Sequence, residues 1–152
     1  MGIVLPDSIL GSPGLGYIRE WLIQNHRIIA SIDLHRDTFQ PHNGTQTSVL
    51  FLQKKTKAEK EKELQTGTMP NYNIFMAMVE KVGHDKRGNP TFKRDKEGNE
   101  ILVDEENNLQ MDVTSDGTQT VTHKQKRKVE DDQTCDVPAL FARWKKEEGI
   151  GW

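Results

Sequence analysis

A short apolar segment, residues 47–52, follows a polar loop that contains a single aromatic residue, Phe39. Short apolar runs bounded by turn-forming residues are typical of buried strands. A loop at the end of a buried strand is a common place for functional side chains. The neighbours of Phe39 include Pro41, Gly44 and Thr45, which form turns or are polar. The ring therefore either plugs the end of a sheet, which is the commoner role of such aromatics, or contacts a ligand.

The segments before this loop predict two more strands and a helix. Residues 3–6 and 27–34 are apolar and rich in β-branched side chains, as in buried strands. Between them, a serine followed by a proline predicts a helix that begins after Ser12. A strand, a helix and a strand in about 30 residues predict a parallel pair. Only a loop leads on to residues 47–53, and so short a link favours an antiparallel neighbour. We therefore expect the edge of an α/β sheet whose last strand runs backwards.

Composition limits the kinds of function that the chain can have. The hydrophobic fraction is 34% and the net charge is −2, so no overall field attracts the chain to nucleic acid, and any contact with DNA has to be local. One cysteine, Cys135, excludes a disulfide framework and a thiolate metal site. His35 and His42 share a loop but have no third ligand, so we expect no metal. The sequence contains no apolar run of 18 residues and no signal peptide, and we expect a soluble, cytoplasmic protein.

The second half of the chain is more polar than the first. Residues 54–63 form a run of charges, which indicates a solvated linker or a frayed helix. Residues 72–82 predict a strand buried on both faces, with a helix as the alternative. We divide the chain into residues 1–56 (α/β core), 57–71 (charged linker) and 72–152 (tail).

The tail combines turns, a hairpin and a closing helix. Residues 85–89 and 95–99 are near-repeats of an Asp-x-x-Gly-Asn turn, and neither has the carboxylate spacing of a calcium loop. We expect residues 84–136 to be rich in turns and to contain a hairpin. A proline followed by an apolar stripe predicts a helix over residues 137–148. That stripe has to dock either on the sheet or on another protein.

Several segments together resemble one protein family. They resemble the C-terminal half of the N6-adenine DNA methyltransferase domain, with its tail, in the modification (M) subunits of type I restriction–modification systems. The resemblance covers nearly the whole chain and is most specific over residues 2–55. The residues that carry it are Gly2-Ile3-Val4-Leu5-Pro6-Asp7, Ile9-Leu10, Ile18-Arg19-Glu20-Trp21-Leu22, residues 28–34, Thr38-Phe39-Gln40-Pro41, residues 44–54, Tyr72-Asn73-Ile74-Phe75-Met76-Ala77 and Gly83-His84-Asp85-Lys86-Arg87-Gly88-Asn89.

This resemblance implies a Rossmann-like sheet of seven strands with the last one antiparallel, and places residues 2–6, 27–34 and 47–53 on its last three strands. It implies an enzyme that flips an adenine out of the duplex and methylates it from S-adenosylmethionine. The family's acidic Gly-rich cofactor motif and its Asn-Pro-Pro-aromatic motif both precede the strand that starts at Gly2. We therefore expect the chain alone to bind no cofactor and to be inactive, as an excised or truncated piece or as one part of a split system.

The resemblance assigns few functional residues to this chain and no catalytic one. Phe39 matches the aromatic residue that stacks on the flipped adenine, and Pro41, Gly44 and Thr45 match the loop that holds it. Lys54 matches the basic residue that closes the strand, and we consider it a candidate for contact with DNA. The implied partners are DNA and the specificity and restriction subunits, and we expect the isolated chain to form a homo-oligomer through unpaired strand edges. The alternative is a non-catalytic module that docks the subunits of a restriction–modification complex.

Overall fold

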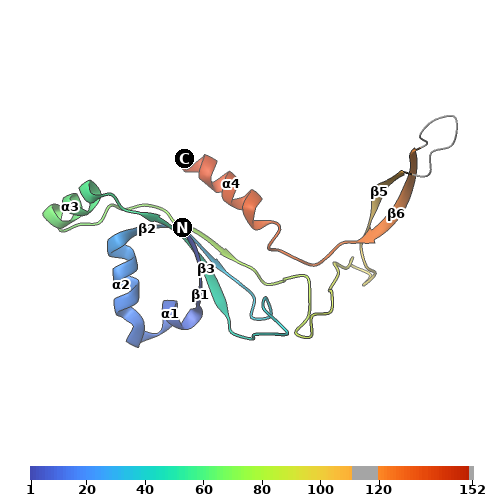
Figure 1. Cartoon of the computed structure of the whole chain (residues 1–152), viewed down its shortest axis with the longest axis horizontal. Coiled ribbons are helices and arrows are strands. Elements are labelled where there is room, and N and C mark those ends of the chain that lie inside the picture. Colours follow the sequence, from blue (N-terminus) through green and yellow to red (C-terminus); the bar gives the residue numbers. More distant parts are fainter. Residues whose placement is uncertain (111–119, 151–152) are drawn as a thin grey trace.

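The computed structural model describes residues 1–110 and 120–150. It is a mixed α/β structure in which a four-stranded sheet carries helices on both faces and a two-stranded hairpin projects to one side (Figure 1). In chain order the elements are β1 (Gly2–Pro6), α1 (Asp7–Gly11), the 3₁₀ helix η1 (Pro13–Leu15), α2 (Gly16–Asn25), β2 (His26–Asp33), β3 (Thr47–Lys54), α3 (Lys57–Thr66), β4 (Phe75–Met78), β5 (Leu102–Gln110), β6 (Thr120–Lys128) and α4 (Val137–Glu147).

The strands of the main sheet lie in the order β1-β3-β2-β4. β3 is antiparallel to both β1 and β2, which confirms the predicted reversal, and β4 is parallel to β2. β1 and β2 run in the same direction but do not pair, because β3 lies between them. The expectation of a directly paired β1 and β2 is therefore wrong. In this inner position the backbone groups of β3 have partners on both sides, which suits a strand as apolar as this one.

The main core lies between α2 and one face of the sheet. Leu22 of α2 packs against Leu50 and Leu52 of β3, and all three are buried. Because strand side chains alternate between faces, Phe51 projects toward the opposite face of the sheet. The half-buried residues that complete the core are Ile3, Leu5, Leu10, Ile18 and Ile28.

The helix before β2 begins later than the sequence predicts. Ser12 makes no side-chain capping bond, and the chain passes through α1 and η1 before α2 starts at Gly16. The Arg19 guanidinium donates hydrogen bonds to the carbonyl oxygens of Ile9 at 2.9 Å and Ser12 at 2.8 Å. The Arg19 side chain of α2 therefore satisfies carbonyl oxygens at the end of α1. The sequence had predicted a single helix capped by Ser12 in this region.

The C-terminal helix α4 docks on the face of the sheet that α2 leaves open. The pairing register places Phe75 of β4 level with Ala30, which is level with Phe51. The Phe75 ring lies 5.3 Å from that of Phe141 and 5.6 Å from that of Trp144, between ring centroids. The apolar stripe of α4 therefore docks on the sheet, which is one of the two partners expected from the sequence.

β4 is shorter and more exposed than the strand predicted over residues 72–82. Phe75 is 8% exposed, but Met76 is 76% and Met78 is 70% exposed. The core under α2 draws residues from β1, β2 and β3 and none from β4. The predicted burial on both faces is therefore wrong, because one face of this outer strand has no cover.

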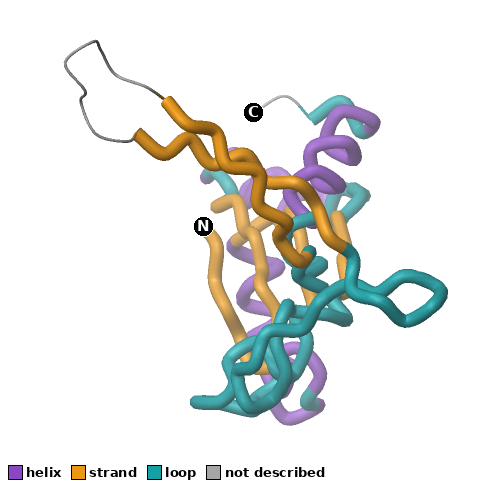
Figure 2. Tube along the Cα trace, turned by 90° about the vertical axis from the view of Figure 1, so that its right-hand side faces the viewer, coloured by secondary structure: helices purple, strands orange, loops and turns teal. Residues whose placement is uncertain are grey.

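The tail is built from turns and a hairpin, as predicted. Asp85 Oδ1 accepts hydrogen bonds from the backbone N–H groups of Arg87 and Asn89, and Asp95 makes the same pattern in the second turn. Gly88 has a φ of 84°, a conformation that favours glycine. β5 and β6 pair antiparallel, and Figure 2 shows this hairpin in front of the sheet. Residues 111–119, between the two strands, lie outside the described part of the chain.

Within the described residues, no helix combines the length and the apolar character needed to cross a membrane.

Candidate functional site

The carboxyl ends of β1, β2 and β4 lie at one end of the sheet, because the three strands run in the same direction. We call this end the carboxyl edge. Open α/β sheets commonly bind ligands outside this edge. The segment from residue 34 to residue 46, here called the β2–β3 loop, lies there and contains Phe39. The structure therefore places the predicted site loop at the edge where chemistry is expected.

Polar contacts fix the base of the β2–β3 loop to the sheet. The Ser48 hydroxyl donates to Asp7 Oδ1 at 3.0 Å, and the Asp7 N–H donates to the Gln46 carbonyl oxygen at 3.1 Å. Gln46 Nε2 reaches Asp33 Oδ1 at 3.4 Å. The Thr47 hydroxyl is buried and has no hydrogen-bond partner among the described residues. Such a group needs a water or a ligand atom as its partner.

The β2–β3 loop satisfies much of its own backbone. The His35 carbonyl oxygen accepts the Thr38 hydroxyl at 2.6 Å, and the Phe39 carbonyl oxygen accepts the Asn43 N–H at 2.9 Å. The Asn43 side-chain oxygen accepts the Thr45 N–H at 2.9 Å. This series of side-chain and backbone hydrogen bonds stabilises the turns of the loop.

The Phe39 ring is held on this loop with 40% of the residue exposed, whereas Phe75 in the core is 8% exposed. Pro41, Gly44 and Thr45 are also exposed. A Cβ at Gly44 would lie 2.7 Å from the side-chain nitrogen of Gln40, so that side chain folds against the glycine. The four predicted loop residues therefore share one exposed loop, and Phe39 is the only large apolar side chain among them.

The Asp85–Asn89 turn lies against the same loop, which sequence reasoning missed. A Cβ at Gly88 would meet the Pro41 ring at 3.4 Å. Lys86 and Arg87, the two residues before this glycine, are exposed. Hydrogen bonds from the Asn89 side chain and backbone, and then from the Arg87 N–H, hold the pKa of the Asp85 carboxyl below its ordinary value. These hydrogen bonds therefore favour the ionised form of Asp85. The local pattern predicted the turn, but only the tertiary structure brings its two cations beside the loop.

Lys54 is not brought together with the other predicted site residues. It ends β3, which begins beside the β2–β3 loop at Thr47 and spans about 23 Å at about 3.3 Å per residue. Its Cα is level with His26, at the start of β2. Lys54 therefore lies at the opposite edge of the sheet from Phe39.

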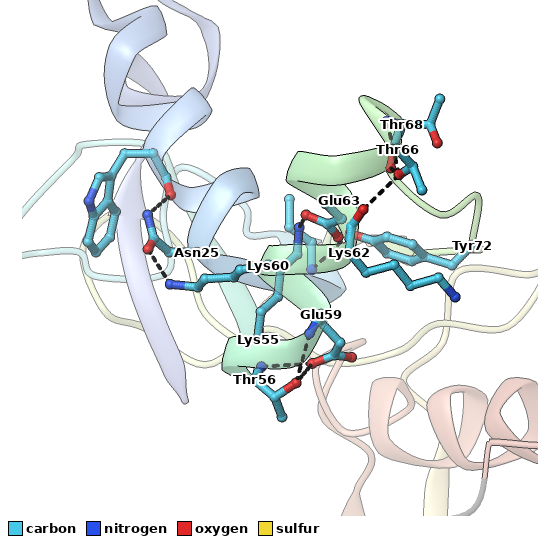
Figure 3. Close-up of polar contacts among 12 residues, drawn as sticks. Asn25, Lys55, Thr56, Glu59, Lys60, Lys62, Glu63, Thr66, Thr68 and Tyr72 are labelled. Atoms are coloured by element: carbon cyan, nitrogen blue, oxygen red, sulfur yellow. Dashed lines mark hydrogen bonds and ion pairs between the residues drawn. The ribbon is translucent and has the colours of Figure 1, made fainter.

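A second polar cluster occupies that opposite edge (Figure 3). Lys55 Nζ lies 2.7 Å from Glu63 Oε2, and both side chains are largely buried. Lys60 Nζ donates to the Asn25 side-chain oxygen at 2.7 Å. The adjoining hollow, of about 250 Å³, is lined by Arg27, Lys55, Glu59, Lys62, Glu63, Thr66, Thr68, Pro70 and Tyr72. The Lys55–Glu63 ion pair and the Lys60–Asn25 hydrogen bond tie α3 to the rest of the chain, so we assign this cluster a structural role.

Comparison with known proteins gives no family: no protein-family model and no curated protein matches this chain. In the part of the chain that the structure describes, no group of three His, Cys, Asp or Glu side chains is placed to hold a metal ion. The β2–β3 loop, with the adjoining Asp85–Asn89 turn, is the arrangement best suited to contact a ligand.

Proposed function

We propose that this chain contributes the target-base loop of a site-specific DNA adenine-N6 methyltransferase of the modification-subunit type. The observation that carries the proposal is the Phe39 ring, half-exposed on a self-bonded loop at the carboxyl edge of the sheet. An aromatic ring presented in this way can stack on an extruded base, which contributes about 1–3 kcal/mol per base.

Charge near the loop supports a nucleic-acid ligand. Arg36 on the loop and Lys86 and Arg87 on the adjoining turn are all exposed. Three cations, on the loop that carries the exposed ring and on the turn that lies against this loop, are suited to hold the phosphates that flank a stacked base. The net charge of −2 does not oppose this, because phosphate contacts depend on local charge.

The methyl donor does not fit the residues present. Of the glycines with a positive φ in the described residues, at positions 67, 83, 88, 98 and 149, none lies in the turns after β1 or β2. β1 passes directly into α1 without a Gly-rich turn. The sequence also contains no Asn-Pro-Pro-aromatic motif. S-adenosylmethionine and the acceptors that polarise the adenine amino group would have to be held by residues outside this sequence.

The proposal is tested by the binding of a single-stranded oligonucleotide with 2-aminopurine in place of one adenine. Stacking on an aromatic ring changes the fluorescence of this base. We expect Phe39→Ala to weaken binding by about 10- to 100-fold, from the stacking free energy of about 1–3 kcal/mol. The melting temperature should hardly change, because the ring is not part of the core.

Two matched variants complete this experiment. Phe51 is 44% exposed but lies in the middle of β3, so Phe51→Ala should leave binding unchanged. Phe75→Ala, in the core, should cost about 3–5 kcal/mol of stability. Equal affinities for Phe39→Ala and the unchanged chain, or a loss of stability in Phe39→Ala like that of Phe75→Ala, would show that Phe39 is a packing residue.

The second candidate function, a docking module for the subunits of a restriction–modification complex, is favoured by the projecting β5–β6 hairpin (Figure 1). Its base exposes Leu102 at 50% and Val103 at 42%. A docking module without a base-binding role would show no effect of Phe39→Ala on binding of the oligonucleotide, so the same experiment separates the two candidates.

A further inference from the structure

A hollow of about 410 Å³ is formed by the start of β2, the segment before β4 and the end of α4. Arg27, at the start of β2, is level with Gln53 near the end of β3, so the hollow lies away from the carboxyl edge and from Phe39. Its volume is within the range of small-molecule sites. The polar and aromatic residues of its lining are Arg27, Asn71, Tyr72, Asn73, Trp144 and Glu148.

The Arg27 guanidinium is held in place without an acceptor for its N–H groups. It lies over the Tyr72 ring, with Cζ 4.8 Å from the ring centroid. The ring is itself fixed, because the Tyr72 hydroxyl accepts the Ile28 N–H at 3.2 Å. Arg27 is half-buried, and in the described part of the chain no carboxylate or carbonyl oxygen bonds to its guanidinium. A planar group with five donors is suited to bind an anion such as a carboxylate.

The nearest acidic residue on α3 is already engaged elsewhere. Glu59 lines the neighbouring hollow of about 250 Å³ together with Arg27. Its Oε2 atom accepts the Thr56 N–H at 2.7 Å and the Thr56 hydroxyl at 2.8 Å. These hydrogen bonds direct the Glu59 carboxylate to the start of α3, and it forms no ion pair with Arg27 among the described residues.

A negative group, Glu148, lines the same hollow from the end of α4. The Asn73 side-chain nitrogen donates to both Glu148 carboxylate oxygens, at 3.0 Å and 2.9 Å. A neutral amide orients the carboxylate but does not balance its charge. Within the described residues, Arg27 and Glu148 form no ion pair with each other. The hollow therefore presents a positive group from β2 and a negative group from α4, each held by a neutral neighbour.

Apolar side chains form the rest of the lining. Ile29, on β2, is 7% exposed. The Trp144 ring is anchored in the core, with its centroid 5.6 Å from that of Phe75. Ile150 adds an apolar side chain from the segment after α4. An apolar group that carries charges of both signs would thus find a matching surface for each of its parts.

We propose that this hollow binds a small zwitterion, of the class of free amino acids and short peptides. Its carboxylate binds the Arg27 guanidinium, its ammonium group binds the Glu148 carboxylate, and its apolar side chain packs against Trp144. Such a ligand neutralises both charged groups at once, whereas a ligand with one charge leaves the other group without a partner. The inference goes beyond the proposed function and does not depend on it.

NMR titration of the ¹⁵N-labelled chain with L-phenylalanine tests this site. We expect the signals of Ile28, Ile29, Asn73 and Glu148 to shift as the ligand is added up to about 10 mM, where a site with a Kd of about 1 mM is nearly filled. Glycyl-L-phenylalanine is titrated in parallel, and the tighter of the two ligands shows whether the site prefers a free amino acid or a peptide. No shift with either ligand would overturn the proposal.

Blocked ligands test the two charges without any change to the protein. N-acetyl-L-phenylalanine lacks the ammonium group, and L-phenylalaninamide lacks the carboxylate. We expect each to bind about tenfold or more weakly than L-phenylalanine, because one charged hydrogen-bonding partner is lost. Equal Kd values for all three compounds would show that the shifts come from apolar contact alone and would overturn the proposal.

Variants assign each charge to its side chain. Glu148→Gln should weaken binding of L-phenylalanine but hardly change that of the N-acetyl compound, and Arg27→Gln should weaken L-phenylalanine but hardly change the amide. Arg143→Gln is the control, because Arg143 pairs with Glu147 and does not line this hollow. Circular dichroism compares the folding of the variants. Binding that Arg143→Gln weakens and that the two folded site variants leave unchanged would place the ligand elsewhere.

Discussion

Lys54 and Lys55 are neighbours in the sequence, yet the structure gives them different surroundings. Lys54 is exposed at the end of β3. Lys55 is 9% exposed, its N–H donates to the Asn25 carbonyl oxygen at 3.0 Å, and its side chain pairs with Glu63. The resemblance to methyltransferases drew attention to Lys54, but the lysine with a defined partner is Lys55. Its function is to hold α3 against the sheet, because a largely buried ammonium group needs an anionic partner.

At the residue scale, we predict that Glu63→Ala lowers stability by about 1–3 kcal/mol. The substitution leaves the buried Lys55 ammonium group without its acceptor at 2.7 Å. Urea unfolding, followed by circular dichroism, measures the change. Glu61→Ala, on the exposed side of the same helix, should change stability by less than about 0.5 kcal/mol. Equal unfolding midpoints for the two variants would mean that the pair contributes nothing.

At the scale of the element, α3 shows how a charge-rich segment becomes a helix. Thr56 and Glu59 form a reciprocal capping box, in which the Thr56 hydroxyl accepts the Glu59 N–H at 3.2 Å and the Glu59 carboxylate accepts the Thr56 N–H at 2.7 Å. Gly67 ends the helix with a φ of 66°. With both ends satisfied, a segment without an apolar face is helical. The choice between linker and helix for residues 57–66 is therefore decided in favour of the helix.

We predict that Thr56→Ala weakens α3 by about 0.5–2 kcal/mol, the usual effect of losing an N-cap. Amide hydrogen exchange in α3 should become about 2- to 30-fold faster. Thr56→Ser keeps the hydroxyl and should change exchange little. If the alanine variant exchanges like the serine variant, the capping box does not stabilise this helix.

The same capping box makes α3 sensitive to acid. Hydrogen bonds from the Thr56 N–H and then from its hydroxyl lower the pKa of Glu59 below the ordinary value of a glutamate. A lowered pKa in the folded state stabilises the helix above the ordinary pKa, and this contribution is lost as the pH falls through the lowered value. NMR titration should therefore show the Glu59 pKa returning toward its ordinary value in Thr56→Ala.

At the scale of the whole molecule, the carboxyl edge of the sheet carries the exposed β2–β3 loop but no Gly-rich turn after β1 or β2. We predict no measurable binding of S-adenosylmethionine by this chain, with a Kd weaker than about 100 µM, equivalent to about −5.5 kcal/mol. Isothermal titration calorimetry measures this directly. Tighter binding would show that the donor site lies within these residues and would require a different account of the fold.

The sequence by itself determined the features that depend on neighbouring residues. Strand segments, the reversal of β3, the Asp85 turn and the α4 helix follow from apolar periodicity, link length and turn chemistry, which act over a few residues. The tertiary structure alone decided that β3 enters between β1 and β2, that β4 is the open edge and that the Asp85–Asn89 turn lies against the β2–β3 loop at Pro41. Such arrangements depend on contacts between segments that are far apart in the sequence. An apolar strand is stable at any position in a sheet where both its edges and both its faces are covered. The local sequence pattern does not specify which of these positions the strand takes.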